Sequence, residues 1–353
     1  MNNSSSSALP KISRDLSIDI LKAIAIFGVI IIHTCSYNYE IASVNWITSV
    51  FWGSAARASV PIFFMCSGAL LLAPRKNFST KRFFKKKVLR ILVAMLFWAM
   101  AYKVFHLLVG HNLSIANIFQ SFKEVLLFNQ EFHLYFLQII LIVYLFLPIT
   151  KIITEHATKR QLEYSLVLWF ALGIVFPTVY IYWPFTLLSD IPMQYKISMT
   201  YSAIGYGLLG YYLKQYPLQN RKGYTVLTII GFLITFGGTY ISSSRQGVLD
   251  PHFLEGMSVG VCILAAGIFG ICISAKSPEN KIIRKSAVYL SKASFCIFLT
   301  HLFFIYALSS LGITAAILPT AVSIPLVAII ILICSTLTYE VLSRIPIVNE
   351  WLI

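Results

Sequence analysis

The chain has 353 residues, of which 58% are hydrophobic and 12% charged, with a formal net charge of +15. Its mean hydropathy of +0.78 excludes an ordinary soluble domain, in which about a quarter of the residues are charged. A basic balance is also found in nucleic-acid-binding proteins, but in a chain this apolar the Lys and Arg residues fix the orientation of membrane helices. We therefore expect an integral membrane protein without a nucleic-acid partner.

Ten apolar stretches have about the length needed to cross a bilayer. They lie at 16–37, 46–73, 88–110, 132–150, 162–182, 198–213, 224–242, 255–275, 288–310 and 317–342. The sixth is short and rich in Gly and Tyr, so it is either little tilted or partly re-entrant. We predict an all-α polytopic fold, divided into a polar cytoplasmic segment (1–15), a membrane domain (16–345) and a short cytoplasmic tail (346–353).

The distribution of basic residues predicts the topology. If the N-terminus lies in the cytoplasm, 22 of the 28 Lys and Arg residues lie on the cytoplasmic side, which predicts that both ends are cytoplasmic. The basic stretch 75–90 is interpreted as a stop-transfer loop that contacts anionic lipid, with a site for a polyanionic acyl donor as the alternative. On the outer side, apolar residues at helical spacing within 111–131 predict an interfacial helix.

Cysteine and metal-ligand patterns point to no further chemistry. The six cysteines all lie inside apolar runs without CxxC or metal-type spacing, which is typical of packing residues. No HExxH, Walker-type or zinc-ligand pattern is present in the sequence. We therefore predict no metal.

Three ionisable residues share the first apolar stretch, where charged groups are costly and usually functional. Lys22 and His33 are eleven residues apart, so in a helix they lie within about 20° of one face and roughly 16 Å apart. Asp19 precedes Lys22 by three residues and can pair with it, although snorkelling at the interface is an equal alternative. His33 can accept a proton if it faces a wet cavity, or it is a hydrogen-bonded interfacial histidine.

The second stretch contains an arginine near mid-span, within RASVPIFFMCSGALLL. The guanidinium of Arg57 stays charged, and its planar fork suits a phosphate, a carboxylate or a polarised carbonyl. A structural partner such as a backbone carbonyl is the alternative. Lys103 and His106 in the third stretch match no motif and are interpreted as structural or interfacial.

Four segments in this order resemble the acyltransferase-3 family of integral-membrane acyltransferases. They span residues 17 to about 310 and read SIDILKAIAIFGVIIIHT, RASVPIFFMCSG, FHLYFL and SKASFCIFLTHLFF. Members of similar length and motif order are O-acetyltransferases of bacterial surface polysaccharides. The resemblance therefore implies a multi-pass enzyme of the bacterial cytoplasmic membrane.

The resemblance also implies roles for individual residues. His33 matches the proposed catalytic base, Arg57 a family arginine, and Lys22 a basic position. His301 matches a recurrent histidine of a late helix. Tyr135 stands where the family commonly has Trp, so local packing or substrate fit differs there.

These residues lead to one expected function and one rival. We expect His33 to deprotonate an acceptor hydroxyl and Arg57 to stabilise charge on the thioester carbonyl. Lys22, with Asp19, would bind or orient acyl-CoA, most simply acetyl-CoA. The set His301, His133 and Tyr135 would contact the acceptor or support the base, and for His301 a structural hydrogen bond between helices is an equal alternative. The expected partners are acyl-CoA, a lipid-linked or cell-surface glycan, and membrane lipid, and the rival function is transport of a polysaccharide or an amino acid in the same fold.

Overall fold

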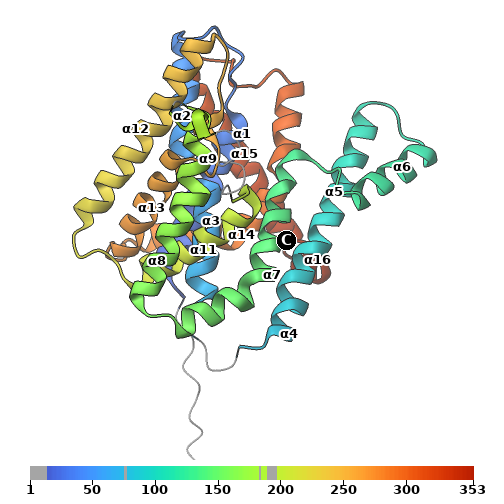
Figure 1. The fold of residues 1–353 in the computed structure, drawn as a ribbon. Helices are drawn as coiled ribbons and strands as arrows, with labels where there is room; N and C mark the ends of the chain where they lie inside the picture. The colour runs from blue at the N-terminus through green and yellow to red at the C-terminus, as the bar shows by residue number, and fades with distance from the viewer. Residues whose placement is uncertain (1–13, 75–77, 183, 189–196) are drawn as a thin grey trace, which may run out of the picture.

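A computed structural model describes residues 14–74, 78–182, 184–188 and 197–353, and Figure 1 shows its fold. The described chain is built of helices and contains no strand, in agreement with the predicted all-α class. Helices are the expected solution inside a bilayer, because each satisfies its backbone hydrogen bonds within one segment.

The helices follow one another with short connections, and most predicted stretches coincide with them. In chain order they are α1 (Leu16–Thr34), α2 (Val44–Ala56), α3 (Ser59–Leu71), α4 (Thr80–Phe83), α5 (Leu89–Val109), α6 (Ile115–Leu126), α7 (Tyr135–His156), α8 (Lys159–Phe170), α9 (Phe176–Val179), α11 (Met199–Gln215), α12 (Arg221–Gln246), α13 (Val259–Ser274), α14 (Lys281–Ser310), α15 (Thr320–Leu342) and α16 (Pro346–Trp351). Short helical turns precede α5, α7 and α13, at Phe84–Val88, Phe132–Leu134 and His252–Leu254.

Nine helical segments of the described chain are long and apolar enough to cross a membrane. The sixth predicted stretch forms α11, which is continuous over 17 residues and therefore about 26 Å long. That length spans most of a hydrocarbon core of about 30 Å. With α11 the described chain has ten candidate spans, and an even number agrees with both ends lying on one side.

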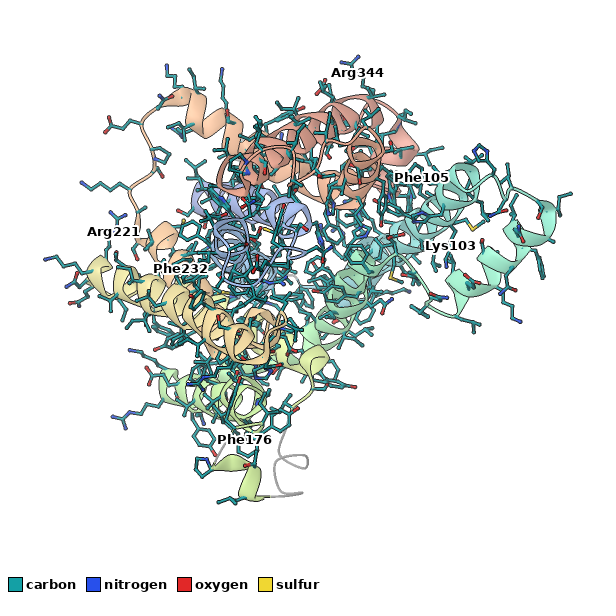
Figure 2. All side chains as sticks on the ribbon, turned by 90° about the horizontal axis from the view of Figure 1, so that it is seen from above. Lys103, Phe105, Phe176, Arg221, Phe232 and Arg344 are labelled. Carbon is teal, nitrogen blue, oxygen red and sulfur yellow. The ribbon has the colours of Figure 1, made fainter. Side chains whose placement is uncertain are left out.

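The first helix lies at the centre of the bundle. It packs against α14, α3 and α15, and the view from above shows the blue N-terminal helices surrounded by the others (Figure 2). Next to it, α3 and α11 approach closely because Gly68 faces Gly207 across the interface, where a Cβ on Gly68 would collide with the backbone of Gly207. The face of α1 that contacts these helices is therefore held firmly in place.

The second predicted stretch is broken in the middle. Helix α2 ends at Ala56 and α3 begins at Ser59, so Arg57 and Ala58 form a turn between two half-helices. Pro61 lies in the first turn of α3, where its missing N–H and fixed φ are tolerated. This turn lies within a single span and places Arg57 at a helix end rather than on a continuous helical surface.

An arm formed by α5 and α6 extends away from the bundle (Figure 1). As predicted, residues 111–131 contain a helix, α6, and its apolar side chains such as Ile115 (89% exposed) and Phe119 (72% exposed) face outward. Lys103 on α5 forms a 2.6 Å ion pair with Glu124 on α6, and this hydrogen bond lowers the pKa of the Glu124 carboxyl. Lys103, which matched no sequence motif, thus ties α6 to α5, and Lys103 lies on the arm in Figure 2.

Candidate active site

Helix α1 begins directly after Asp15, whose side chain caps the N-terminus of the helix. The carboxylate of Asp15 accepts a 3.1 Å hydrogen bond from the backbone N–H of Ser17, which is the usual way to satisfy the free donors of a first turn. The helix then runs without interruption from Lys22 to His33, a rise of about 16 Å. One helix therefore carries a cation near its inner end and an imidazole in its last turn.

The expected pairing of Asp19 with Lys22 is wrong. Asp19 is 5% exposed and accepts hydrogen bonds from Arg14 (2.9 Å) and Ser291 (2.6 Å). Arg14 contacts both carboxylate oxygens of Asp19, and such a two-point guanidinium pair is stronger than a contact with a single ammonium. Asp19 thereby fixes α1 to α14, and Lys22 has no hydrogen-bond or ion-pair partner among the described residues.

Lys22 instead lines a cavity of about 290 Å³ near the predicted cytoplasmic end of the bundle, which we call the inner cavity. Three more cationic residues line it: Lys87, Arg90 and Lys292. Arg90 also donates a hydrogen bond to the backbone carbonyl of Ile353. Four cations from α1, α14, the start of α5 and the helical turn before it converge on one cavity, which is the charge pattern expected for a polyanionic ligand.

A second cavity, of about 330 Å³, lies at the other end of α1 and is called the outer cavity. Both His33 and Arg57 line it, together with Tyr135 and residues of the segment that precedes α13. The Nε atom of Arg57 is buried and has no hydrogen-bond partner. This atom therefore does not make the structural hydrogen bond that the alternative interpretation of Arg57 requires. The turn between α2 and α3 thus presents a guanidinium to the cavity that contains the imidazole.

His33 belongs to a cluster of three histidines drawn from three different helical segments. The ring centroids of His33 and His301 are 5.2 Å apart, and those of His301 and His133 are 5.3 Å apart. His301 is fully buried, and its Nδ1 donates a 2.7 Å hydrogen bond to the carbonyl of Phe298 on its own helix. Because Nδ1 is the donor, the neutral ring has its lone pair on Nε2, which has no partner.

His133, the third member of this cluster, is buried as well. It is 1% exposed, and neither of its ring nitrogens has a hydrogen-bond partner. Buried polar atoms are rarely left unsatisfied unless water, a ligand or chemistry uses them. The His133 and His301 rings are therefore candidates for accepting or passing a proton next to His33.

A polar cluster that matches no sequence motif holds the segment that carries His133. Glu131 accepts a 2.6 Å hydrogen bond from Tyr306 and forms a 2.9 Å contact with the Nε2 atom of His106. Glu131 is thus connected to α5 and α14 at once. His106 thus connects α5 to the segment before α7, and no sequence motif indicated this contact.

All the residues predicted for the site are placed by the structure, and they fall into two groups. His33, Arg57 and Tyr135 line the outer cavity, His301 contacts the ring of His33, and His133 contacts the ring of Phe132, which also lines this cavity. Lys22 lines the inner cavity, whereas Asp19 lies beside it and reaches it through Ser291. Within the described chain, no three His, Cys, Asp or Glu side chains are arranged to hold a metal ion.

The sequence as a whole matches a family model described as an acyltransferase domain, over residues 15–340. The chain belongs to the acyltransferase-3 family. Comparisons with curated proteins and with solved structures found no match. The matched residues include every member of the candidate site, so this multi-pass membrane acyltransferase has its two cavities within the family domain.

Proposed function

We propose that the protein is an O-acyltransferase that moves an acyl group, in the simplest case acetyl, from cytoplasmic acyl-CoA to a hydroxyl of a lipid-linked or cell-surface glycan. The observation that carries the proposal is that His33 and Arg57 line one cavity, while Lys22, about 16 Å away along the same helix, lines a cavity with three further cations. A donor site and a reaction site are thereby connected by a single rigid element.

The inner cavity fits the donor. Acyl-CoA is a cytoplasmic thioester with several phosphate groups, and clustered Lys and Arg side chains bind phosphates through charge-assisted hydrogen bonds. Lys22 and Lys292 face the cavity from α1 and α14, and Asp19 keeps these two helices together through Ser291. We therefore assign phosphate binding to the cations and a positioning role to Asp19.

The outer cavity fits the reaction. His33 removes the proton of the acceptor hydroxyl as its oxygen attacks the thioester carbonyl carbon, and Arg57 stabilises the negative charge that develops on the carbonyl oxygen. The carbon–sulfur bond then breaks, and the CoA thiolate takes the proton that His33 has received. His301 packs against the His33 ring, His133 packs against His301, and Tyr135 lines the side on which the acceptor would lie.

The test uses inverted membrane vesicles from the native host, which expose the cytoplasmic face and contain the natural acceptor. Vesicles with the wild-type chain should release CoA thiol from acetyl-CoA and place radiolabelled acetyl on a saccharide fraction, and vesicles from a deletion strain should do neither. Mass spectrometry of the surface glycans should show acetyl groups lost from the deletion strain. Movement of a glycan or an amino acid without thioester consumption would support the transporter alternative and reject this proposal.

A further inference from the structure

On two helices, neighbouring residues line different cavities. On α3, Phe63 lines the inner cavity and the next residue, Phe64, lines the outer one. On α7, Phe136 lines the inner cavity and the preceding residue, Tyr135, lines the outer one. Consecutive Cα atoms are 3.8 Å apart, so on two helices the boundary between the cavities falls between neighbouring residues.

Aromatic rings fill this boundary. The rings of Phe64 and Phe136 lie 5.1 Å apart, and those of Phe136 and Phe298 also lie 5.1 Å apart. We call these three side chains, from α3, α7 and α14, the phenylalanine partition. Phe64 is 1% exposed and Phe298 5% exposed, so the rings are packed against one another.

The partition touches the histidine cluster directly. The Phe298 ring lies 5.4 Å from the His133 ring, and the backbone carbonyl of Phe298 accepts the hydrogen bond from His301. Phe136 is the least buried of the three, and both Phe136 and Phe298 form part of the inner-cavity wall. A group that travels from the cationic inner cavity toward His33 therefore meets the rings of Phe136 and Phe298 first, and the histidines lie immediately behind these rings.

We propose that the phenylalanine partition is the gate through which the acyl end of the donor passes, and that its ring size selects short acyl groups over long ones. The inference rests on the proposed function, because it takes the inner cavity as the donor site. Phe136 and Phe298 act as specificity-determining residues, since the space released when their rings rotate limits the acyl chain that can cross. A thioester with one or two carbons in its acyl chain needs the smallest displacement of packed rings.

The experiment compares acetyl-CoA with butyryl-CoA and hexanoyl-CoA in the vesicle assay, with wild type, Phe136→Ala, Phe298→Ala and Phe136→Trp. We expect both Ala variants to raise the butyryl-to-acetyl ratio of kcat/KM by about tenfold or more, because one methylene in an apolar pocket changes discrimination by 10- to 200-fold. Phe136→Trp should lower the same ratio. A general loss of stability would not raise the butyryl-to-acetyl ratio for a smaller side chain and lower it for a larger one.

The matched control is Phe97→Ala. Phe97 lies on α5, is 48% exposed and lines neither cavity, so its removal should leave the ratio at the wild-type value. If Phe136→Ala does not fold, Phe136→Leu replaces it, and the ratio should still rise, by a smaller factor.

Two results would overturn the gate, and they differ from failure of the proposed function. An unchanged butyryl-to-acetyl ratio in Phe136→Ala and Phe298→Ala, with acetyl transfer retained, would show that the partition does not select the acyl group. A ratio raised equally by Phe97→Ala would show a non-specific effect. If wild-type vesicles consume no acyl-CoA of any length, the proposed function itself fails and the gate is rejected with it.

Discussion

The imidazole of His33 on α1 lies 5.2 Å, centroid to centroid, from the imidazole of His301 on α14. The His33 ring is half-buried and lines the outer cavity, whereas the His301 ring is fully buried. The buried ring is fixed by its hydrogen bond to Phe298, so it is a rigid support for the other. This geometry separates the roles of the two histidines and leads to the first two predictions.

Replacing His33 with Ala should reduce acyl transfer by about 10²-fold or more, because a general base contributes at least that factor. Membrane insertion and expression should be unchanged, since the substitution removes no topological signal. The measurement is CoA thiol release from acetyl-CoA in the vesicle assay. The control is His156→Ala, at the exposed inner end of α7, which should keep wild-type turnover; wild-type turnover in His33→Ala as well would rule out the assigned role.

Two substitutions at His301 distinguish a structural hydrogen bond from a role next to the base. His301→Asn can still donate a hydrogen bond toward the Phe298 carbonyl but has no Nε2 atom, whereas His301→Ala loses both. We expect both variants to lose about 5- to 30-fold in kcat, on the scale of 1 to 2 kcal/mol for a lost ring contact. Full kcat in His301→Asn, with reduced kcat in His301→Ala, would instead show that only the hydrogen bond within α14 matters.

Arg57→Lys should lower kcat by about 10²-fold, the scale of one lost donor at a developing oxyanion. A lysine keeps the charge but cannot reproduce the planar fork, and it would sit in the same turn between α2 and α3. The matched comparison is Arg344→Lys, an exposed residue that forms an ion pair with Glu340 near the end of α15, which should be neutral. Full activity in Arg57→Lys would indicate simple charge compensation.

Much of the fold was predictable because hydropathy alone marks membrane-spanning segments. The helical repeat also placed Lys22 and His33 at the two ends of one helix, and each lines a cavity. The predicted ends of the helices were less accurate, since α7 continues to His156 and α14 begins at Lys281. Polar residues outside the hydrocarbon region can still continue a helix.

Contacts between helices were not predictable from one sequence. Asp19 was expected to pair with its near neighbour Lys22, but a stronger partner, Arg14, reaches it from before the helix, and Ser291 reaches it from α14. The break at Arg57 was not predicted either, since a proline such as Pro61 in a first turn does not by itself show where the preceding helix ends. Likewise, the contacts of His133 with His301 depend on tertiary packing that no spacing within one helix encodes.

Replacing Lys22 with Ala should raise the KM for acetyl-CoA by about tenfold with little change in kcat, because a hydrogen bond to a charged group contributes about 1.5–3 kcal/mol. The expected cause is a lost phosphate contact in the inner cavity. Acetyl-dephospho-CoA, with one phosphate fewer, should show a smaller KM difference between wild type and variant if Lys22 contacts that phosphate. A large fall in kcat with an unchanged KM would contradict donor binding by Lys22.

The sidedness of the chain can be tested with two introduced cysteines in a background without the six native ones. Lys86→Cys lies in the basic segment before α5, and Leu113→Cys lies in the exposed connection to α6. The distribution of Lys and Arg places the first in the cytoplasm and the second outside. In intact cells or right-side-out vesicles, Leu113→Cys should react with a membrane-impermeant maleimide, and Lys86→Cys only with a permeant one.

Sidedness constrains the mechanism, because acyl-CoA is available only in the cytoplasm. With Lys86 inside, the cationic inner cavity opens toward the donor, and His33 lies about 16 Å farther outward. The acyl group must then be drawn into the bilayer span, past the phenylalanine partition, before or during transfer. If the impermeant reagent labelled Lys86→Cys in right-side-out vesicles and not Leu113→Cys, the inner cavity would face the outside, and the donor role assigned to Lys22 would have to be abandoned.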